Sequence, residues 1–181
     1  GNNKTAAELR EALENKLGQI VINSVDEIEL LESISEEMGI IPKVMLRISP
    51  SVDAHTHTAT TTGLVDSKFG VAIENNEAYD ACIQINEAKH LDFRGIHMHI
   101  GSPIFGMEPY IAGVKVGAQL IRQLLDVGIL ISDFSPGGGF AVAYINSDNP
   151  PEPSAYADAI CNTLAEQADQ LSFPPPRLII E

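Results

Sequence analysis

Residues 93–102 read FRGIHMHIGS, an apolar run that becomes polar where it ends. The pattern predicts a β-strand over residues 93–99, and His97 and His99, two residues apart, then project from the same face of that strand. Gly101 and Ser102 follow, turn the chain and offer a hydroxyl group and a backbone N–H. This combination suits a flat aromatic cofactor with a phosphate tail, and it also suits a metal ion.

Strand patterns and amphipathic helices alternate along the rest of the chain. Further strands are predicted at residues 19–23, 43–48, 129–134 and from 177 to the end, and residues 51–70 form a polar excursion without a period. Capping boxes at Thr5 with Glu8 and at Ser24 with Glu27 indicate the starts of two helices, and Gly39 indicates the end of the second. A helical pattern covers about residues 75–89, Pro109 indicates the start of a further helix, and Ser154 precedes a helix over about 155–171. Five strands joined by helical crossovers predict a mainly parallel sheet.

Periodicity alone does not distinguish a doubly wound sheet from a (β/α)8 barrel. A complete barrel needs roughly 250 residues, so a chain of this length supplies about five of the eight β/α units. The polar candidates His97, His99, Ser102, Gly137–Gly139 and Glu181 all lie at or just after predicted strand ends, where barrel active sites assemble. We therefore expect an α/β fold, a partial TIM-type barrel of parallel strands.

The composition is acidic, with 25 Asp and Glu against 11 Lys and Arg and a formal net charge of −14. A nucleic-acid partner is not expected, because no basic stripe is present to neutralise phosphates. The sequence has no signal-peptide pattern and no apolar run near about 18 residues, which argues against secretion and membrane insertion. Cys82 and Cys161 are expected to be free thiols in a reducing compartment, and the cytoplasm is the expected location.

Glycines 137–139 come directly after a predicted strand, and their N–H groups, unobstructed by any Cβ, are suited to hold a phosphate. A plain tight turn is the alternative interpretation, as an ordinary turn residue is for Ser102 and an exposed terminal carboxylate for Glu181. His97 and His99, with His55 and His57, would instead suit a metal-dependent hydrolase. A phosphate-binding glycine run has no obvious role in such a hydrolase, so no metal site is predicted.

Five segments carry a more specific signal: GNNK (1–4), LRISPSVDAHTHTATTTGLVDSKFG (46–70), GIHMHIGSPIF (95–105), PGGGFAVAY (136–144) and LIIE (178–181). Together they resemble the fold-type III pyridoxal-phosphate-dependent amino-acid decarboxylases, and among these the diaminopimelate decarboxylases. The DAHTH block followed by HxHIGS is the specific part of the resemblance. The sequence departs from the family at Pro103, where glutamine is usual, and at the Ser135-Pro136 pair before the glycines.

The resemblance implies pyridoxal 5'-phosphate as the cofactor and gives roles to individual residues. His99 would stack on the face of the pyridine ring, and Glu181 would keep the ring nitrogen protonated. Ser102 and Gly137, Gly138 and Gly139 would hold the phosphate, Gly139 most directly. His97 would be a structural neighbour, and Lys68 would serve dimer contacts.

The activity that the resemblance implies is the decarboxylation of meso-2,6-diaminopimelate to L-lysine and CO2 by a homodimer. A decarboxylase of another amino acid, of the ornithine, lysine, arginine or carboxynorspermidine type, and a non-catalytic homologue are the alternatives. The chain starts at Gly1 without an initiator Met and stops in a strand pattern, so we expect residues 1–181 to be part of a barrel domain. The family's Schiff-base lysine and C-terminal β-domain would lie outside these residues, and the segment alone is expected to be inactive.

Overall fold

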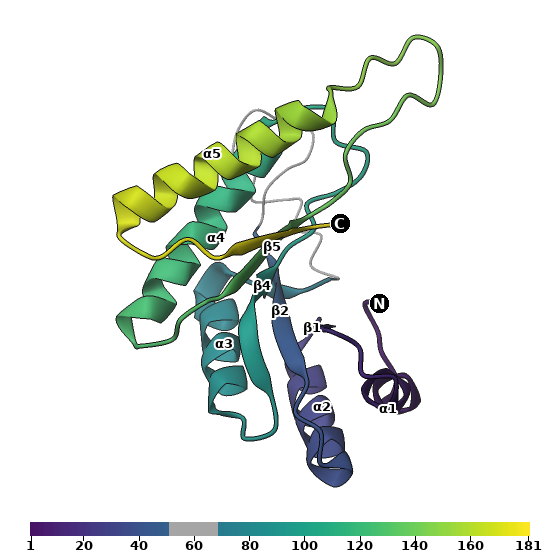
Figure 1. The fold of residues 1–181 in the computed structure, drawn as a ribbon, viewed down its shortest axis with the longest axis vertical. Coiled ribbons are helices and arrows are strands. Elements are labelled where there is room, and N and C mark those ends of the chain that lie inside the picture. Colours follow the sequence, from purple (N-terminus) through teal and green to yellow (C-terminus); the bar gives the residue numbers. More distant parts are fainter. Residues whose placement is uncertain (51–68) are drawn as a thin grey trace.

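The computed structural model describes residues 1–50 and 69–181 (Figure 1). The helices are α1 (Ala6–Glu14), α2 (Val25–Met38), α3 (Glu77–Glu87), α4 (Glu108–Asp126) and α5 (Pro153–Leu171), with a short 3-10 turn, η1, at Glu74–Asn76. The strands are β1 (Ile20–Ile22), β2 (Lys43–Ser49), β3 (Val71–Ala72), β4 (Asp92–His97), β5 (Asp133–Gly137) and β6 (Arg177–Ile180). Among the helices of the described ranges, none has the length and apolar character needed to cross a membrane.

The strand order distinguishes the two folds that the sequence left open. All strand pairs are parallel, and the sheet has the order β1-β2-β4-β5-β6, with β3 paired to β2. A doubly wound sheet reverses its strand order at a switch point, whereas the five main strands of the described residues follow chain order. The helices α1 to α5 each contact the next one along the chain, and Figure 1 shows them around the outside of the sheet. This is the arrangement of a barrel wall.

A hydrogen bond across the inside of the sheet shows how strongly it curls. Gln19, next to β1, donates from Nε2 to Oδ2 of Asp133 at the start of β5 over 3.1 Å. In the strand order, β2 and β4 lie between β1 and β5, a separation of about 14 Å in a flat sheet. Only a curved sheet brings these two side chains together. Arg177 of β6 donates to the same buried carboxylate at 2.9 Å, so polar contacts link three strands at their N-terminal ends.

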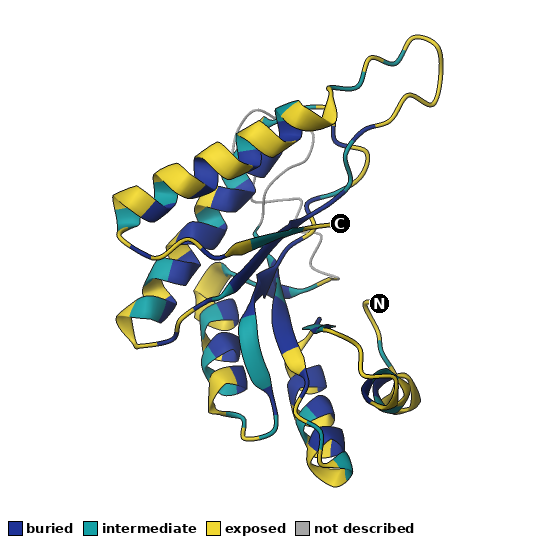
Figure 2. Cartoon of the chain, viewed as in Figure 1, coloured by how far each residue is buried: buried dark blue, intermediate teal, exposed yellow. Residues whose placement is uncertain are grey.

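The apolar core fills the space between the curved sheet and its helices. Figure 2 shows the buried residues on the helix faces that turn towards the strands. Leu46 of β2, Ile96 of β4 and Phe134 of β5 are each 0% exposed. Gly117 of α4 lies against the ring of Phe134, where an added Cβ would come within 2.8 Å of the ring. This close contact fixes α4 against β5, whose C-terminal end carries the glycine run.

Two predicted strands differ from the structure by two residues or more at one end or both. β4 ends at His97 instead of continuing to residue 99, so His99 lies in the segment after the strand. β5 starts at Asp133, where its pairing with β4 begins, and not at residue 129. Residues 129–131 alternate between buried and exposed outside the ladder, with Leu130 59% exposed. This alternation of buried and exposed positions has the same pattern as a β-strand.

The predicted capping box of α1 is confirmed. The Thr5 hydroxyl accepts the Glu8 N–H at 3.3 Å, and the Glu8 carboxylate accepts the Thr5 N–H at 2.8 Å. The start of α5 differs from the prediction, because the helix begins at Pro153 with Glu152 as its N-cap, one residue before Ser154. Proline is well suited to a first helical position, where its missing N–H costs no hydrogen bond.

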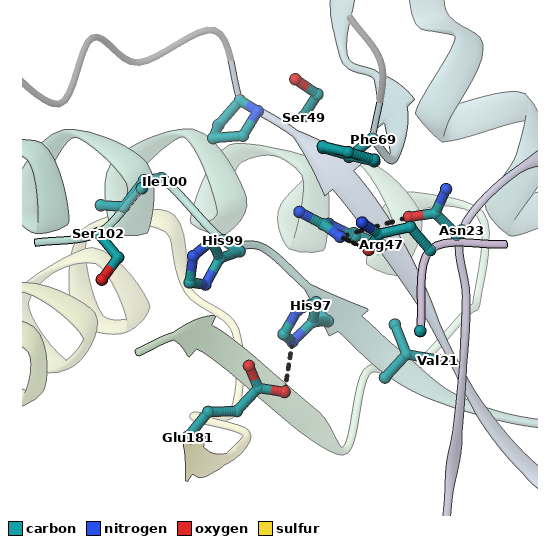
Figure 3. A pocket seen from close by; sticks show the side chains of 14 residues that line it. Val21, Asn23, Arg47, Ser49, Phe69, His97, His99, Ile100, Ser102 and Glu181 are labelled. Carbon is teal, nitrogen blue, oxygen red and sulfur yellow. Dashed lines mark hydrogen bonds and ion pairs between the residues drawn. The ribbon is translucent and has the colours of Figure 1, made fainter. Parts of the chain in front are cut away.

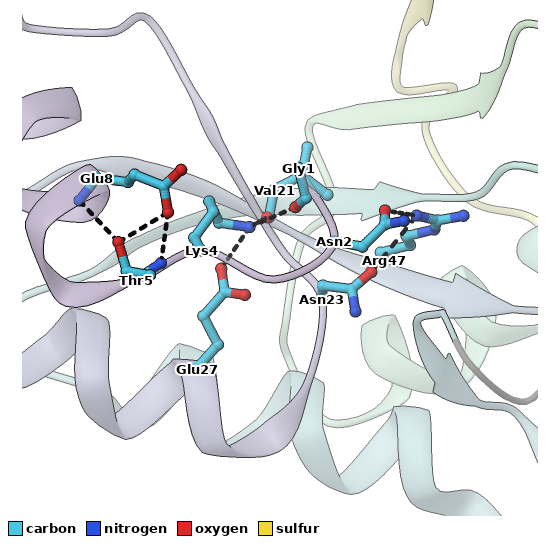
Figure 4. Close-up of polar contacts among 9 residues, drawn as sticks. All are labelled: Gly1, Asn2, Lys4, Thr5, Glu8, Val21, Asn23, Glu27 and Arg47. Atoms are coloured by element: carbon cyan, nitrogen blue, oxygen red, sulfur yellow. Dashed lines mark hydrogen bonds and ion pairs between the residues drawn. The ribbon is translucent and has the colours of Figure 1, made fainter.

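The capping box predicted for α2 is wrong. Ser24 makes no side-chain cap hydrogen bond, and Glu27 lies instead 2.6 Å from Nζ of Lys4 (Figure 4). Glu27 is 6% exposed, and a buried carboxylate is stable only when it is paired with a cation. The Lys4 ammonium group also donates to the carbonyl of Val21 at 2.8 Å. The glutamate therefore ties the N-terminal segment to β1 and α2.

The two caps give a matched pair of stability predictions. Thr5→Ala is expected to lower the free energy of unfolding by about 1 kcal/mol, the usual cost of losing an N-cap side chain. Ser24→Ala is expected to change it by only a few tenths of a kcal/mol, because the Ser24 hydroxyl makes no cap bond. Chemical denaturation of both variants measures the difference. Equal losses would contradict the assigned caps.

Candidate active site

A cavity of about 650 Å³ opens at the C-terminal ends of the strands (Figure 3). Asn23 follows β1, Arg47 lies near the end of β2, His97 ends β4 and Glu181 follows β6, and all four line this cavity. The strands are parallel, so their carboxyl ends meet at one edge of the sheet. In barrels this is the edge at which active sites are built.

The structure brings most of the predicted site residues to this cavity. His97, His99, Ser102 and Glu181 line it, and Figure 3 shows the two histidine rings on the same side of the chain. The four residues differ in exposure, because His97 is buried whereas His99 and Ser102 are exposed and the Glu181 side chain is 55% exposed. A bound molecule can therefore reach His99, Ser102 and Glu181 directly, with His97 lying beneath them.

The glycine run lies behind the cavity wall, packed between two backbone segments. An added Cβ would come within 2.4 Å of the Met98 carbonyl oxygen at Gly137 and within 2.4 Å of the Glu181 carbonyl oxygen at Gly138. At Gly139 it would come within 2.0 Å of the Gly101 carbonyl oxygen. The run therefore has to be glycine for packing reasons alone, and it holds the segment after β4 against the end of β6.

Each carbonyl group of this run has a donor in the structure. Gly137 O accepts from the N–H of Glu181 at 3.1 Å, Gly138 O from the Tyr110 hydroxyl at 2.7 Å, and Gly139 O from the N–H of Ile104 at 2.9 Å. In contrast, the N–H groups of Gly138 and Gly139 donate to no atom of residues 1–50 or 69–181. Two unpaired N–H donors beside Ser102 are what a phosphate group requires. The donor set therefore fits a phosphorylated cofactor.

His97 lies between a hydroxyl group and a carboxylate. Its Nδ1 is 3.1 Å from Oγ of Ser135 and 3.8 Å from Oε1 of Glu181. Burial lowers the pKa of the His97 imidazole from 6.5 to about 4; Glu181 opposes this shift, and the nearby Arg47 and His99 reinforce it. The imidazole is therefore neutral at neutral pH, and it leaves the negative charge of Glu181 uncompensated on that side.

The depressed pKa of His97 predicts a pH dependence of stability. Below pH 6.5 the unfolded chain binds a proton at this residue, whereas the folded chain does so only near pH 4. The contribution of neutral His97 to the free energy of unfolding is therefore fully present above pH 6.5. It is lost as the pH drops towards 4, and the loss is about 3 kcal/mol at most. Denaturant unfolding across this range measures the slope. His97→Gln should flatten it, and an unchanged slope in that variant would contradict the assignment.

Two polar residues of the site, Arg47 and Ser135, were given no role there from the sequence, and Ser135 was noted only as a departure from the family pattern. Arg47 of β2 donates to Oδ1 of Asn2 at 2.6 Å, and its guanidinium group lies 5.3 Å from the centroid of the Phe69 ring. An arginine inside the apolar run KVMLRI was the available signal. Ser135, the partner of His97, also accepts the N–H of Gly137 at 3.3 Å. Its signal was a hydroxyl residue two positions before the glycine run.

Three residues named from the sequence, His55, His57 and Lys68, lie outside the described residues. The metal alternative rested on His97 and His99, with His55 and His57 as further candidate ligands. Within the described part of the chain, no group of three or more His, Cys, Asp or Glu side chains could hold a metal ion.

Comparison with known proteins places this chain in a family. The family model of the pyridoxal-dependent decarboxylase, pyridoxal binding domain, matches residues 1–181. A diaminopimelate decarboxylase of Bacillus subtilis (strain 168) is 38% identical over the whole chain, which spans 42% of its length. One of Staphylococcus aureus (strain COL) has the same identity and coverage. The chain thus spans about two fifths of the curated relatives that it matches.

A solved structure has the same fold. Diaminopimelate decarboxylase from M. jannaschii in co-complex with L-lysine matches with a TM-score of 0.90 and 31% identity, over 100% of this chain and 41% of that one. The similarity confirms the partial barrel of parallel strands and the resemblance seen in the sequence motifs. The chain belongs to the family of the pyridoxal-binding domains of pyridoxal-dependent decarboxylases.

Proposed function

We propose that this chain is the cofactor-binding part of an enzyme that decarboxylates meso-2,6-diaminopimelate to L-lysine and CO2. One observation carries the proposal: Gly138 and Gly139, whose N–H groups have no partner among the described residues, lie directly against Glu181 and Ser102, which line one cavity. These groups supply an anion site and a carboxylate for a single ligand. The names of the relatives, and the L-lysine in one related structure, support this choice of substrate and product.

The described residues divide the work of holding pyridoxal 5'-phosphate. The N–H groups of Gly138 and Gly139 and the Ser102 hydroxyl would hold the phosphate, and the exposed imidazole of His99 would cover one face of the ring. Glu181 would face the ring nitrogen and hold a proton there. When bound, the cofactor supplies an electron sink for the pair of electrons left behind as CO2 departs.

His97 supports the role of Glu181 by staying neutral. A protonated imidazole 3.8 Å from the carboxylate would compete with the ring nitrogen for its negative charge. Burial prevents this, because it lowers the pKa of His97 to about 4. The full charge of Glu181 is then available to the cofactor.

The complete enzyme needs more than residues 1–181 under this proposal. The lysine that binds the cofactor covalently and a C-terminal β-domain would be contributed by the rest of the protein, which would act as a homodimer. The fraction of the relatives that the chain spans, 42% of the Bacillus subtilis enzyme, supports this division.

A substrate assay on the full-length protein tests the proposal. Purified protein with pyridoxal 5'-phosphate is incubated with meso-2,6-diaminopimelate, L-lysine, L-ornithine or L-arginine, and released CO2 and the amine product are measured. We expect CO2 and L-lysine from meso-2,6-diaminopimelate and little turnover of the others. Preferred turnover of another amino acid would overturn the substrate, and no turnover of any of them would overturn the activity.

A further inference from the structure

The hydroxyl group of Tyr110 makes a buried contact with the glycine run. Tyr110 lies in the first turn of α4, is 0% exposed, and donates to the carbonyl oxygen of Gly138 over 2.7 Å. Its ring is fixed by Phe140 and Tyr156, whose ring centroids lie 5.3 and 5.7 Å away. Burial raises the pKa of the Tyr110 phenol above its ordinary value, so the hydroxyl keeps its proton and remains a donor.

This bond determines the direction of a neighbouring N–H group. The Gly138 carbonyl and the Gly139 N–H belong to one planar trans peptide unit, in which the two groups point in opposite directions. Because Tyr110 holds the carbonyl towards the core, the Gly139 N–H points away from it, and it has no partner among the described residues. Glycine has little conformational preference of its own, so the direction depends on such external donors.

Tyr110 is the one side chain among the three donors that hold the carbonyls of this run. The other two are the backbone N–H groups of Glu181 and Ile104. We propose that Tyr110 is a positioning residue for the cofactor phosphate, because its hydroxyl orients the Gly138–Gly139 peptide so that the Gly139 N–H can donate to that phosphate. The inference rests on the proposed function, since it assumes that pyridoxal 5'-phosphate binds at this site.

The test compares a ligand that carries the phosphate with one that lacks it. In the full-length protein, Tyr110→Phe removes the hydroxyl and keeps the ring. We expect the affinity for pyridoxal 5'-phosphate to fall about tenfold, the equivalent of one hydrogen bond, and the affinity for pyridoxal to stay within twofold. Equilibrium titration of both ligands gives the ratio of the two affinities. A general loss of structure would lower both affinities and leave this ratio unchanged.

Tyr156→Phe is the matched control. Tyr156 belongs to the same aromatic cluster, is 1% exposed, and its hydroxyl donates to the carbonyl of Ile104 at 2.7 Å, away from the Gly138 carbonyl. We expect both variants to lose similar stability, and only Tyr110→Phe to change the ratio of the two affinities. An unchanged ratio in Tyr110→Phe, or an equal change in Tyr156→Phe, would overturn the role of Tyr110.

A measurement on the wild-type protein keeps the inference testable if Tyr110→Phe does not fold. Hydrogen exchange of the peptide that contains Gly139 should slow when pyridoxal 5'-phosphate binds and should not slow with pyridoxal. Binding of the phosphorylated ligand without this protection overturns the inference and leaves the proposed function standing. If the wild-type protein binds no pyridoxal 5'-phosphate at all, the proposed function fails with it.

Discussion

Gly139→Ala is expected to abolish measurable binding of pyridoxal 5'-phosphate, with a loss of affinity on the order of 100-fold or more, and to lower the free energy of unfolding by several kcal/mol. The new Cβ would come within 2.0 Å of the Gly101 carbonyl oxygen and 3.3 Å of the Ser102 Cβ. The obstacle is backbone, so the segment that carries His99 and Ser102 must move away from the glycine run. Titration with the cofactor and denaturant unfolding measure the two effects.

Gly39→Ala is the control that separates the steric clash of a new Cβ from the cost of a positive φ at a non-glycine residue. Gly39 also has a positive φ, +66° against +84° at Gly139, but an added Cβ there would meet no atom within 4 Å. It ends α2, outside the residues that line the cavity. We expect this control to lose about 1 kcal/mol of stability and to bind the cofactor normally. Normal cofactor binding by Gly139→Ala would contradict the packing described for the site.

Glu181→Gln is expected to reduce turnover by about 100- to 1000-fold, with much less effect on cofactor affinity. The amide keeps the size of the side chain but carries no charge, so it cannot favour a proton at the ring nitrogen. Removing a preorganised electrostatic partner from an active site has effects of this size. The variant is also expected to lower the pKa of His97 further, because Glu181 raises that pKa in the native protein.

Steady-state decarboxylation and cofactor titration measure the two parts of this prediction. Glu166→Gln, on the exposed face of α5, is the matched control for loss of one carboxylate, and it should leave both unchanged. Turnover of Glu181→Gln within a few-fold of the native enzyme would show that Glu181 does not act on the ring nitrogen.

The type and order of the main elements could be predicted from the sequence because local patterns determine them. Apolar periodicity, the Thr5 cap and Pro109 each reflect contacts within one element. The capping box predicted at Ser24 was wrong because Glu27 forms an ion pair with Lys4, a residue distant in the sequence. The predicted start of β5 was also wrong. Residues 129–131 alternate between buried and exposed as a strand does, but tertiary packing places them outside the sheet.

The same distinction separates the site residues that were predicted from those that were missed. His99, Ser102 and Glu181 follow strands, and parallel strands bring their ends together, so strand positions were enough to place them at one cavity. Ser135 and Tyr110 act through partners 38 and 28 residues away, His97 and Gly138. Their partners depend on the packing of α4 and β5 against β4, which no short motif encodes.

A crystal structure of the full-length enzyme with pyridoxal 5'-phosphate bound tests the proposed cofactor site most directly. We predict the phosphate within hydrogen-bond distance of the N–H groups of Gly138 and Gly139 and of the Ser102 hydroxyl, with Glu181 facing the ring nitrogen. A cofactor bound with its phosphate away from these glycines, or with its ring nitrogen away from Glu181, would contradict the roles proposed for these residues.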